Sequence, residues 1–200
     1  MGKIDSVIFD WGGVLIDDPR AELLRYCAEA FGVTQELYTP AHDSCLNGIH
    51  TGLIDEETFW REVAQKLDKP MPDSPSLWFN AFNSAYVPKQ EMFLLASSLH
   101  DKGYKTALLS NTEPPAVRLF HEMGYDMFDV TVFSCDEGTM KPDRRIYELT
   151  LERLDSQAEQ TVFIDDNFNY IQGAKNLRLH TILFENVTKV KNELTKLGVE

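Results

Sequence analysis

The sequence predicts an α/β fold with two parts, a three-layer α/β/α core with a mainly parallel sheet and an all-helical insertion. Short, continuously apolar runs alternate with helical patterns along most of the chain, as in parallel sheets that helices cover on both faces. Residues 16–86 contain no such run and carry helical stripes instead. We therefore expect a discontinuous core made of residues 1–15 and 87–200, and a helical cap domain made of residues 16–86.

Four apolar runs are the expected strands of the core, and a fifth, short run is a further one. Val7-Ile8-Phe9 is followed by Asp10 and then by two glycines, a pattern typical of a buried strand that enters a tight loop. The other expected strands are residues 106–109, 130–133, 161–164 and, as the fifth run, 181–184. Parallel α/β sheets bind ligands outside the carboxyl ends of their strands, so the polar residues after these runs form the expected site.

Helical stripes occur in both parts of the chain. In the insertion, residues 23–31 and 59–67 each present an apolar face at helical spacing, and Asp55 is a suitable N-cap for the second helix. In the core, residues 92–99 form another stripe, which Gly103 ends as a glycine beyond the last turn. These stripes predict the helices that should bury the sheet and fill the insertion.

Composition and charge exclude several classes of partner. The 200 residues are 43% hydrophobic, and 32 acidic against 19 basic residues give a net charge of −13. Such a charge repels nucleic acids and anionic membranes, whereas a small anionic substrate is still allowed because a local cation sets the potential inside a pocket. Three separated cysteines and the absence of a signal-like or membrane-spanning run favour a cytoplasmic protein, expected as a monomer or homodimer.

Four separate segments place chemically useful side chains at strand ends or in the loops that follow. They are Phe9-Asp10-Trp11-Gly12-Gly13-Val14, Leu109-Ser110-Asn111-Thr112, Gly138-Thr139-Met140-Lys141-Pro142-Asp143 and Phe163-Ile164-Asp165-Asp166-Asn167. Asp10 ends a buried run, where a charge needs a partner, and it can serve as a nucleophile in phosphoryl transfer. Asp165 and Asp166 repel each other unless a cation lies beside them, and Mg²⁺ prefers such oxygen ligands.

The other two segments supply groups that can hold an anion. Ser110 and Asn111 can donate hydrogen bonds to a phosphate, and Lys141, restricted by the following proline, can offset negative charge. Each group also has an ordinary interpretation, as a turn residue, a helix cap or a solvated surface lysine. The interpretation as one site depends on all four segments occurring together in this order.

In order and residue type, these segments resemble the four motifs of the haloacid dehalogenase superfamily, and residues 16–86 resemble its helical cap. The resemblance covers nearly the whole chain and implies a Rossmann-like core. It implies a Mg²⁺-dependent phosphohydrolase that acts on a small phosphorylated metabolite, a sugar phosphate being one candidate, through an aspartyl-phosphate. The implied catalytic residues are Asp10 and Lys141, the phosphate ligands Ser110, Asn111 and Lys141, and the metal ligands Asp10, the Gly12 carbonyl, Asp165 and, through water, Asp166.

The chain departs from the family pattern at Gly12. Family phosphatases usually carry a second aspartate there, which protonates the leaving oxygen and later activates water, a contribution of roughly a hundred- to ten-thousandfold. Asp17 and Asp18, just beyond the loop, are candidate substitutes. A substrate with a good leaving group, such as a sugar 1-phosphate or an acyl phosphate, would need less proton donation.

Two other functions remain open from the sequence. A 2-haloacid dehalogenase uses the same aspartate against carbon and does not need the second one; Arg20, Arg25 or Arg61 would then hold a halide or carboxylate. A catalytically silent protein that binds a phosphorylated ligand or a protein partner would also tolerate Gly12. The Asp165-Asp166 pair favours the magnesium-dependent reading over the metal-free dehalogenase.

Several further residues have structural interpretations. Trp11 can shape a pocket or simply pack, and Phe59 and Trp60 are expected in the core of the insertion. Gly173-Ala174 is expected where a helix packs closely against the sheet. The five histidines show no spacing that selects a ligand or a catalytic role.

Overall fold

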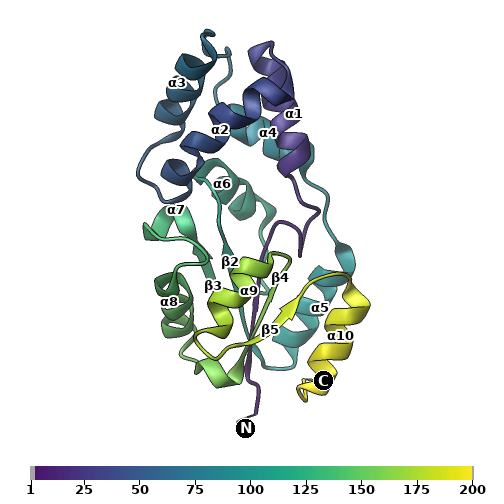
Figure 1. Cartoon of the computed structure of the whole chain (residues 1–200). Coiled ribbons are helices and arrows are strands. Elements are labelled where there is room, and N and C mark those ends of the chain that lie inside the picture. Colours follow the sequence, from purple (N-terminus) through teal and green to yellow (C-terminus); the bar gives the residue numbers. More distant parts are fainter. Residues whose placement is uncertain (1–2, 200) are drawn as a thin grey trace.

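The core of the computed structural model, which describes residues 3–199, is one parallel sheet of five strands. The strands are β1 (Ser6–Phe9), β2 (Lys105–Ser110), β3 (Val130–Phe133), β4 (Thr161–Asp165) and β5 (His180–Leu183). Their order is β3-β2-β1-β4-β5, and every pairing is parallel. The predicted α/β fold is confirmed, including the fifth strand (Figure 1).

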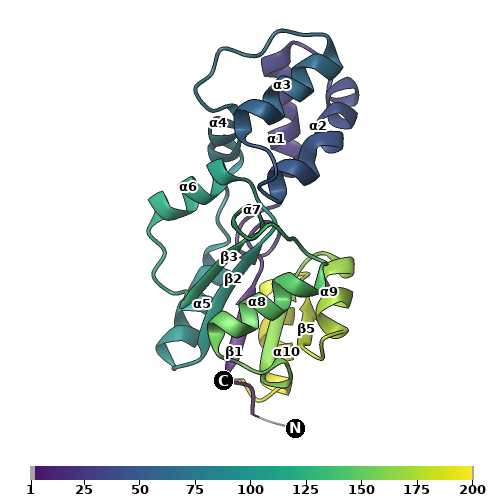
Figure 2. The same cartoon turned by 90° about the vertical axis from the view of Figure 1, so that its left-hand side faces the viewer.

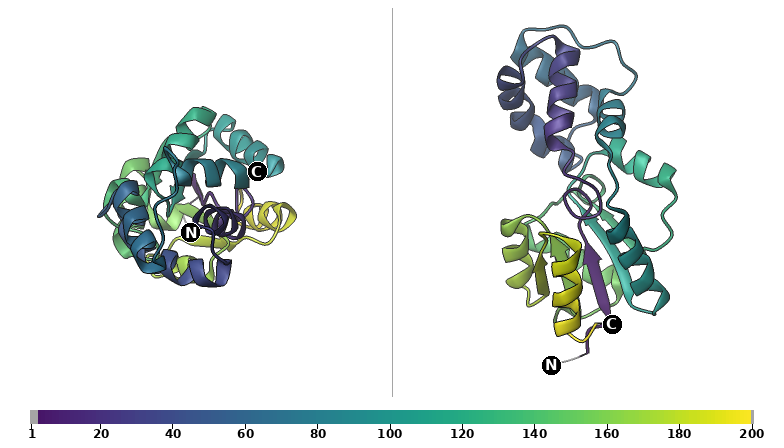
Figure 3. Two further views of the ribbon diagram at one scale, coloured as in Figure 1. Left: turned by 90° about the horizontal axis from the view of Figure 1, so that it is seen from above. Right: turned by 90° about the vertical axis from the view of Figure 1, so that its right-hand side faces the viewer.

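Helices cover both faces of this sheet. Alternate residues of β1 point to opposite faces, so that Val7 and Phe9 join one apolar cluster while Ile8 joins the other. The first cluster is covered by α5 (Gln90–Asp101), α6 (Pro114–Met123) and α10 (Val187–Lys196), and the second by α8 (Arg144–Leu154) and α9 (Phe168–Lys175). Figure 2 views the molecule from the side of α8, and the right-hand view of Figure 3 shows α5 and α10 on the opposite side.

Two short helical segments complete the core. Helix α7 (Ser134–Glu137) follows β3 directly, and the 3-10 turn η1 (Ala158–Gln160) precedes β4. Within residues 3–199, no helix is both long and apolar enough to cross a membrane.

The segment between β1 and β2 begins with a bundle of four helices, α1 (Arg20–Phe31), α2 (Gln35–His50), α3 (Glu56–Leu67) and α4 (Leu77–Ala85). As predicted, Asp55 caps α3 and accepts a hydrogen bond from the Thr58 backbone nitrogen at 2.8 Å. Phe59 and Trp60 are buried with Trp78 in an aromatic core, also as predicted. The apolar residues of the bundle are continuous with the apolar cluster that covers one face of the sheet.

The bundle lies beyond the carboxyl ends of the strands and is attached by two neighbouring chain crossings (Figure 1). Ile16 and Pro88 form an antiparallel bridge, the Asp17 nitrogen donates to the Val87 carbonyl at 2.9 Å, and the Lys89 nitrogen donates to the Leu15 carbonyl at 2.8 Å. The predicted limits of the cap, residues 16–86, stay a prediction. Residues 1, 2 and 200 of the expected core lie outside the described residues.

The small residues Gly173 and Ala174 allow α9 to pack closely on two sides. Ala174 is fully buried in the apolar cluster that contains the strand residues Ile8 and Phe163, so α9 packs against the sheet as predicted for this pair. A Cβ atom at Gly173 would lie 2.9 Å from the Pro142 carbonyl oxygen and 3.0 Å from the Tyr147 hydroxyl. Gly173 itself therefore approaches the loop between α7 and α8, a neighbour that the sequence did not indicate.

Candidate active site

A buried lysine joins two aspartates at the carboxyl ends of adjacent strands. The Lys141 Nζ atom lies 2.8 Å from Asp10 Oδ1 and 2.7 Å from Asp165 Oδ2, and it donates a third hydrogen bond to the Leu109 carbonyl at 3.1 Å. Asp10 follows β1, and Asp165 ends β4, which pairs with β1 in parallel register. Lys141 and Asp165 are 1% and 0% exposed, so these charges compensate one another away from water.

The two carboxylates are oriented by backbone amides as well as by Lys141. The Trp11 nitrogen donates to Asp10 Oδ1 at 2.7 Å, and the Asn167 nitrogen donates to Asp165 Oδ1 at 2.7 Å. Both donors to Asp10 therefore bind the same oxygen, and its Oδ2 atom has no hydrogen bond to another described residue. The geometry leaves one oxygen of Asp10 available to a metal ion or a reacting group.

Lys141 is held in place by the segment after β2. The Asn111 side chain accepts from the Lys141 nitrogen at 2.8 Å and donates to the Lys141 carbonyl at 2.9 Å. Gly173 permits close packing of α9 against the residue after Lys141. Fixing the backbone on both sides makes it possible to hold a long, flexible side chain in a single buried position, which would otherwise carry a large entropic cost.

A third carboxylate completes a group that can hold a divalent cation. One oxygen each from Asp10, Asp165 and Asp166 lies within 4.8 Å of the others. Gly13 has a φ of +82°, and a Cβ atom there would lie 2.1 Å from Asp166 Oδ2, so only glycine lets the loop after β1 approach this carboxylate. Three hard oxygen donors with a single ammonium group leave an excess of negative charge, and this donor set fits Mg²⁺.

The protonation equilibria reflect the crowding of these charges. Burial raises the pKa of the Asp10 carboxyl to about 8, against the opposing effect of Lys141. Burial also disfavours the charge on Lys141, but the Asp10 and Asp165 carboxylates outweigh it and raise the lysine pKa. The pKa of Asp166 is raised by burial first, and then by the charges of Asp165 and Asp18. A bound cation would favour the ionised carboxylates.

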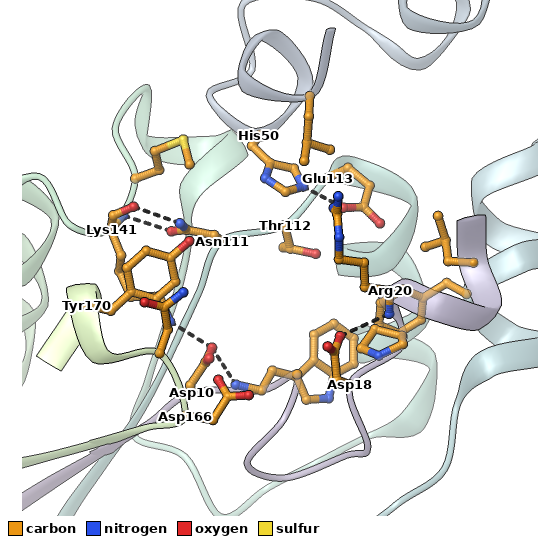
Figure 4. A pocket seen from close by; sticks show the side chains of 18 of the residues that line it. Asp10, Asp18, Arg20, His50, Asn111, Thr112, Glu113, Lys141, Asp166 and Tyr170 are labelled. Carbon is orange, nitrogen blue, oxygen red and sulfur yellow. Dashed lines mark hydrogen bonds and ion pairs between the residues drawn. The ribbon is translucent and has the colours of Figure 1, made fainter. Parts of the chain in front are cut away.

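Asp10, Lys141 and Asp166 form the floor of a cavity of about 390 Å³ between the sheet and the helical bundle, whereas Asp165 is buried behind them and is not among the lining residues. Figure 4 shows Asp10, Asp166 and Lys141 on the core side of this space, with His50 and Glu113 across from Asp10 and Asp166. The bundle contributes mainly apolar side chains to the opposite wall, namely Leu23, Leu24, Leu46, Trp78 and Phe82. The cavity therefore combines a charged floor with a largely apolar wall.

Comparison with known proteins assigns this arrangement to a family. A model of the family described as haloacid dehalogenase-like hydrolase matches residues 4–178. The chain belongs to this family of hydrolases. Its helical insertion between β1 and β2 is typical of the C1 type of cap found in this family. The resemblance inferred from the four sequence segments is confirmed.

This haloacid dehalogenase-like chain matches only a small part of some curated relatives and nearly the whole length of others. The chain is 30% identical to mouse acyl-CoA dehydrogenase family member 10 over 96% of its residues, but it spans only 19% of that protein. It is 25% identical to the sesquiterpene phosphatase of Aspergillus oryzae, covering 85% of this chain and 84% of that protein. It is 26% identical to the D-ribitol-5-phosphate phosphatase of Bacteroides thetaiotaomicron, covering 96% and 97%.

A solved structure of similar fold is the magnesium complex of a haloacid dehalogenase family enzyme from Bacteroides thetaiotaomicron. The TM-score is 0.78 at 23% identity, covering 95% of this chain and 99% of that chain. The likeness extends over the sheet and the helical insertion together, which supports the fold described above.

Not every residue proposed from the sequence lies in the cavity of this haloacid dehalogenase-like hydrolase. Ser110 is buried at the end of β2 and is not among the lining residues, so its role as a phosphate ligand stays a prediction. Asn111 lines the cavity, but its amide binds Lys141. Asp18 lines the cavity, whereas Asp17 is 60% exposed and pairs with Lys89 at 2.8 Å. Of the two candidate substitutes for the missing aspartate, only Asp18 faces the site.

Sequence reasoning missed the polar groups at the far side of the cavity. Glu113 and His50 both line it, and His50 Nε2 lies 3.3 Å from Glu113 Oε2. Trp11 both packs and lines the cavity, with its ring 5.0 Å from that of Phe82. The only available signal was the position of Glu113, at the end of the segment after β2 that also carries Ser110 and Asn111.

Proposed function

We propose that this protein is a Mg²⁺-dependent phosphohydrolase that hydrolyses a small phosphate ester, with Asp10 as the nucleophile. The observation that carries the proposal is the contact of Lys141 with both Asp10 and Asp165, because these residues come from three separate segments of the chain. Phosphoryl transfer requires a nucleophile to approach an already anionic group, and the buried ammonium beside Asp10 reduces the repulsion between them.

The contacts of Asp10 support its role as the attacking group. Lys141 and the Trp11 amide fix its Oδ1 atom, so the carboxylate is oriented before the substrate binds. Attack by Asp10 on phosphorus would form an aspartyl-phosphate and release the alcohol, and water would then hydrolyse the acyl phosphate. In this proposal Ser110 and Asn111 lie next to the phosphate, and Asn111 also keeps Lys141 in place.

Magnesium would bind the carboxylates of Asp10 and Asp165 and the Gly12 carbonyl, with Asp166 acting through water. When bound, the ion would neutralise charge on the transferring phosphoryl group. Asp166 is close enough to Asp10 and Asp165 to contribute through one water, and Gly13 keeps the loop from displacing it. The magnesium complex of the structurally similar enzyme and the two phosphatases among the relatives agree with this proposal.

Proton transfer to the leaving group is the step for which the usual aspartate is absent. Of the two substitutes suggested from the sequence, Asp17 and Asp18, only Asp18 lines the cavity, and we propose that Asp18 takes part in this step. Asp18 and Asp166 both line this cavity. Even so, we expect esters with good leaving groups, such as sugar 1-phosphates and acyl phosphates, to react faster than alkyl phosphates.

The test is phosphate release from a panel of phosphorylated metabolites, with Mg²⁺ and with a chelator. Asp10→Asn should lower the rate by on the order of a thousandfold or more, because the amide cannot form the acyl phosphate. The matched control is Asp17→Asn, a change near the same loop but outside the cavity, which should retain the native rate. Equal rates for the native protein and Asp10→Asn would refute the assignment of the nucleophile.

The positions of the arginines do not favour the dehalogenase alternative, which would need one of them to hold a halide or carboxylate. Arg25 pairs with Glu22 and Glu29, Arg61 pairs with Glu57, and these two arginines are not among the residues lining the cavity. Arg20 lines the cavity, but both of its hydrogen bonds at 2.9 Å go to Asp43. Chloride release from 2-chloropropionate without metal would favour that alternative. Ligand binding with no turnover of any phosphate ester would favour the silent binding protein.

A further inference from the structure

A second polar site lies in the cavity, on the side away from the catalytic carboxylates. Glu113 precedes α6 in the core and His50 ends α2 in the bundle, and their side chains meet at 3.3 Å. Figure 4 shows this pair across the cavity from Asp10 and Asp166. The pair is not needed to hold the nucleophile or the cation, so the mechanism above leaves its purpose unexplained.

The Glu113 carboxylate is unusually short of partners for a buried acid. The residue is 4% exposed, its Oε2 atom faces His50, and its Oε1 atom has no hydrogen-bond partner in the described part of the chain. A buried polar oxygen without a hydrogen-bond partner destabilises the protein, and more so when the group is charged. A ligand that donates a hydrogen bond to this carboxylate would remove part of that cost.

Two neighbouring side chains, His42 and Arg20, are both engaged with Asp43. His42 also lines the cavity, is 2% exposed, and has an unpartnered Nε2 atom, while its Nδ1 atom lies 2.9 Å from Asp43 Oδ1. Asp43 accepts a hydrogen bond from His42 Nδ1, and burial lowers the pKa of His42, so the Nε2 atom of the neutral ring is an acceptor. Arg20, the cation on this wall, is already bound to Asp43 by two hydrogen bonds.

We propose that Glu113, positioned by His50, determines specificity: it accepts a hydrogen bond from a hydroxyl on the organic part of the substrate and excludes substrates with a second anionic group there. This inference rests on the proposed phosphohydrolase activity. The substrate class is a phosphorylated polyol or sugar whose far end is neutral.

The arrangement of charges explains both parts of this preference. Two acceptors, Glu113 Oε1 and His42 Nε2, require donors, and a hydroxyl group supplies one without adding charge. A carboxylate or second phosphate would meet a like charge in a poorly solvated wall, where repulsion is much stronger than in water. The same repulsion directs the single phosphate of the substrate toward Lys141. The apolar side chains of the wall can pack against the carbon atoms of the bound molecule.

The test compares two substrates of the same carbon skeleton. Glycerol 3-phosphate ends in a hydroxymethyl group, and 3-phosphoglycerate ends in a carboxylate. The native enzyme should favour glycerol 3-phosphate by at least about tenfold in kcat/KM, and propyl phosphate, without hydroxyls, should show a higher KM. Glu113→Gln should bring the ratio for the matched pair close to one, because it keeps the shape and removes the charge. The control is Glu122→Gln, an exposed change on α6, the helix that Glu113 precedes, which should leave the ratio unaltered.

A second variant separates binding from folding. His50→Gln keeps the Glu113 charge, so discrimination against 3-phosphoglycerate should persist while the KM for glycerol 3-phosphate rises. An unchanged ratio in a folded, active Glu113→Gln enzyme would overturn the inference. A native preference for 3-phosphoglycerate that is lost in Arg20→Gln would overturn it in favour of anion binding by Arg20.

The inference and the proposed function fail in different ways. Without phosphate release from any ester, the phosphohydrolase proposal fails, and the same two compounds are compared by calorimetric binding to the native protein with Mg²⁺. Equal affinities for the pair would then overturn the inference as well, whereas tighter binding of glycerol 3-phosphate that Glu113→Gln abolishes would support it.

Discussion

The two walls of the cavity are built on different physical principles. On the core side, Asp10 and Asp165 follow adjacent parallel strands, and backbone amides and Lys141 fix each carboxylate within hydrogen-bonding distance. On the bundle side, the wall is mostly apolar and is supported by an aromatic cluster that contains Trp78. The comparison teaches that reactivity depends on a few fixed charges, whereas selectivity depends on shape and on an isolated polar pair. Substitutions in the charged wall should therefore mainly lower kcat, and substitutions in the apolar wall should mainly change KM.

The largest effect is expected from Lys141→Met, which removes the cation shared by two buried carboxylates. We expect phosphate release to fall by on the order of a thousandfold or more. Unfolding in urea should show a loss of about 3–5 kcal/mol of stability, because breaking a buried ion pair leaves charge without compensation.

A surface lysine provides the control for this change. Lys189 pairs with Glu185 one turn earlier on the exterior, and Lys189→Met should cost no more than about 0.5 kcal/mol and leave the rate unchanged. A Lys141→Met protein as stable as the native one would show that the buried carboxylates do not need the ammonium group for charge compensation, which would contradict this prediction.

A smaller loss, on the order of ten- to a hundredfold in magnesium affinity, is expected from Gly13→Ala. The added methyl would lie 2.1 Å from Asp166 Oδ2 at a φ of +82°, so the loop must move away from this carboxylate. In Gly12→Ala the methyl would lie 3.4 Å from Pro19 Cδ, an ordinary contact, and magnesium affinity should change little. Titration of phosphate release with Mg²⁺ measures both variants. Similar affinities in the two variants would contradict a role for Asp166 near the metal.

The smallest effect is expected where the bundle rests on the core. A Cβ atom at Gly52 would lie 2.1 Å from the Cys135 carbonyl oxygen, at a φ of +65°. Gly52→Ala should separate the end of α2 from α7 and raise KM several-fold while kcat changes less. Gly32→Ala is the matched control, because it has the same φ of +65° and no atom within 4 Å of the added methyl. A fall in kcat alone would show that this contact affects the charged wall instead.

The core side of the site was predictable from sequence because strand ends converge. An apolar run followed by a carboxylate locates Asp10 and Asp165, and parallel pairing brings them together whatever the intervening chain does. The position of Asn111 was predictable in the same way. Its partner was not, since the two hydrogen bonds to Lys141 depend on how the loop after β3 folds back.

The far side of the cavity was not predictable by this reasoning. His50 and Glu113 meet only because the end of α2 is brought over the start of α6, and no local pattern encodes that contact. Gly173 illustrates the same limit, since its small size indicated a close approach but not that Pro142 would be the neighbour. Tertiary contacts between loops and helices follow from the packing of the whole bundle on the core. That packing depends on many residues together, and no short segment of the sequence encodes it.

Because Ile16 and Pro88 are bridged, the helical insertion enters and leaves the core at neighbouring positions. Because the chain leaves and re-enters at bridged positions, a tight turn from residue 16 to residue 88 would close the backbone without disturbing the strand ends. Changes in the helical insertion can therefore alter the apolar wall of the cavity while the strand ends that carry Asp10 and Asp165 keep their positions.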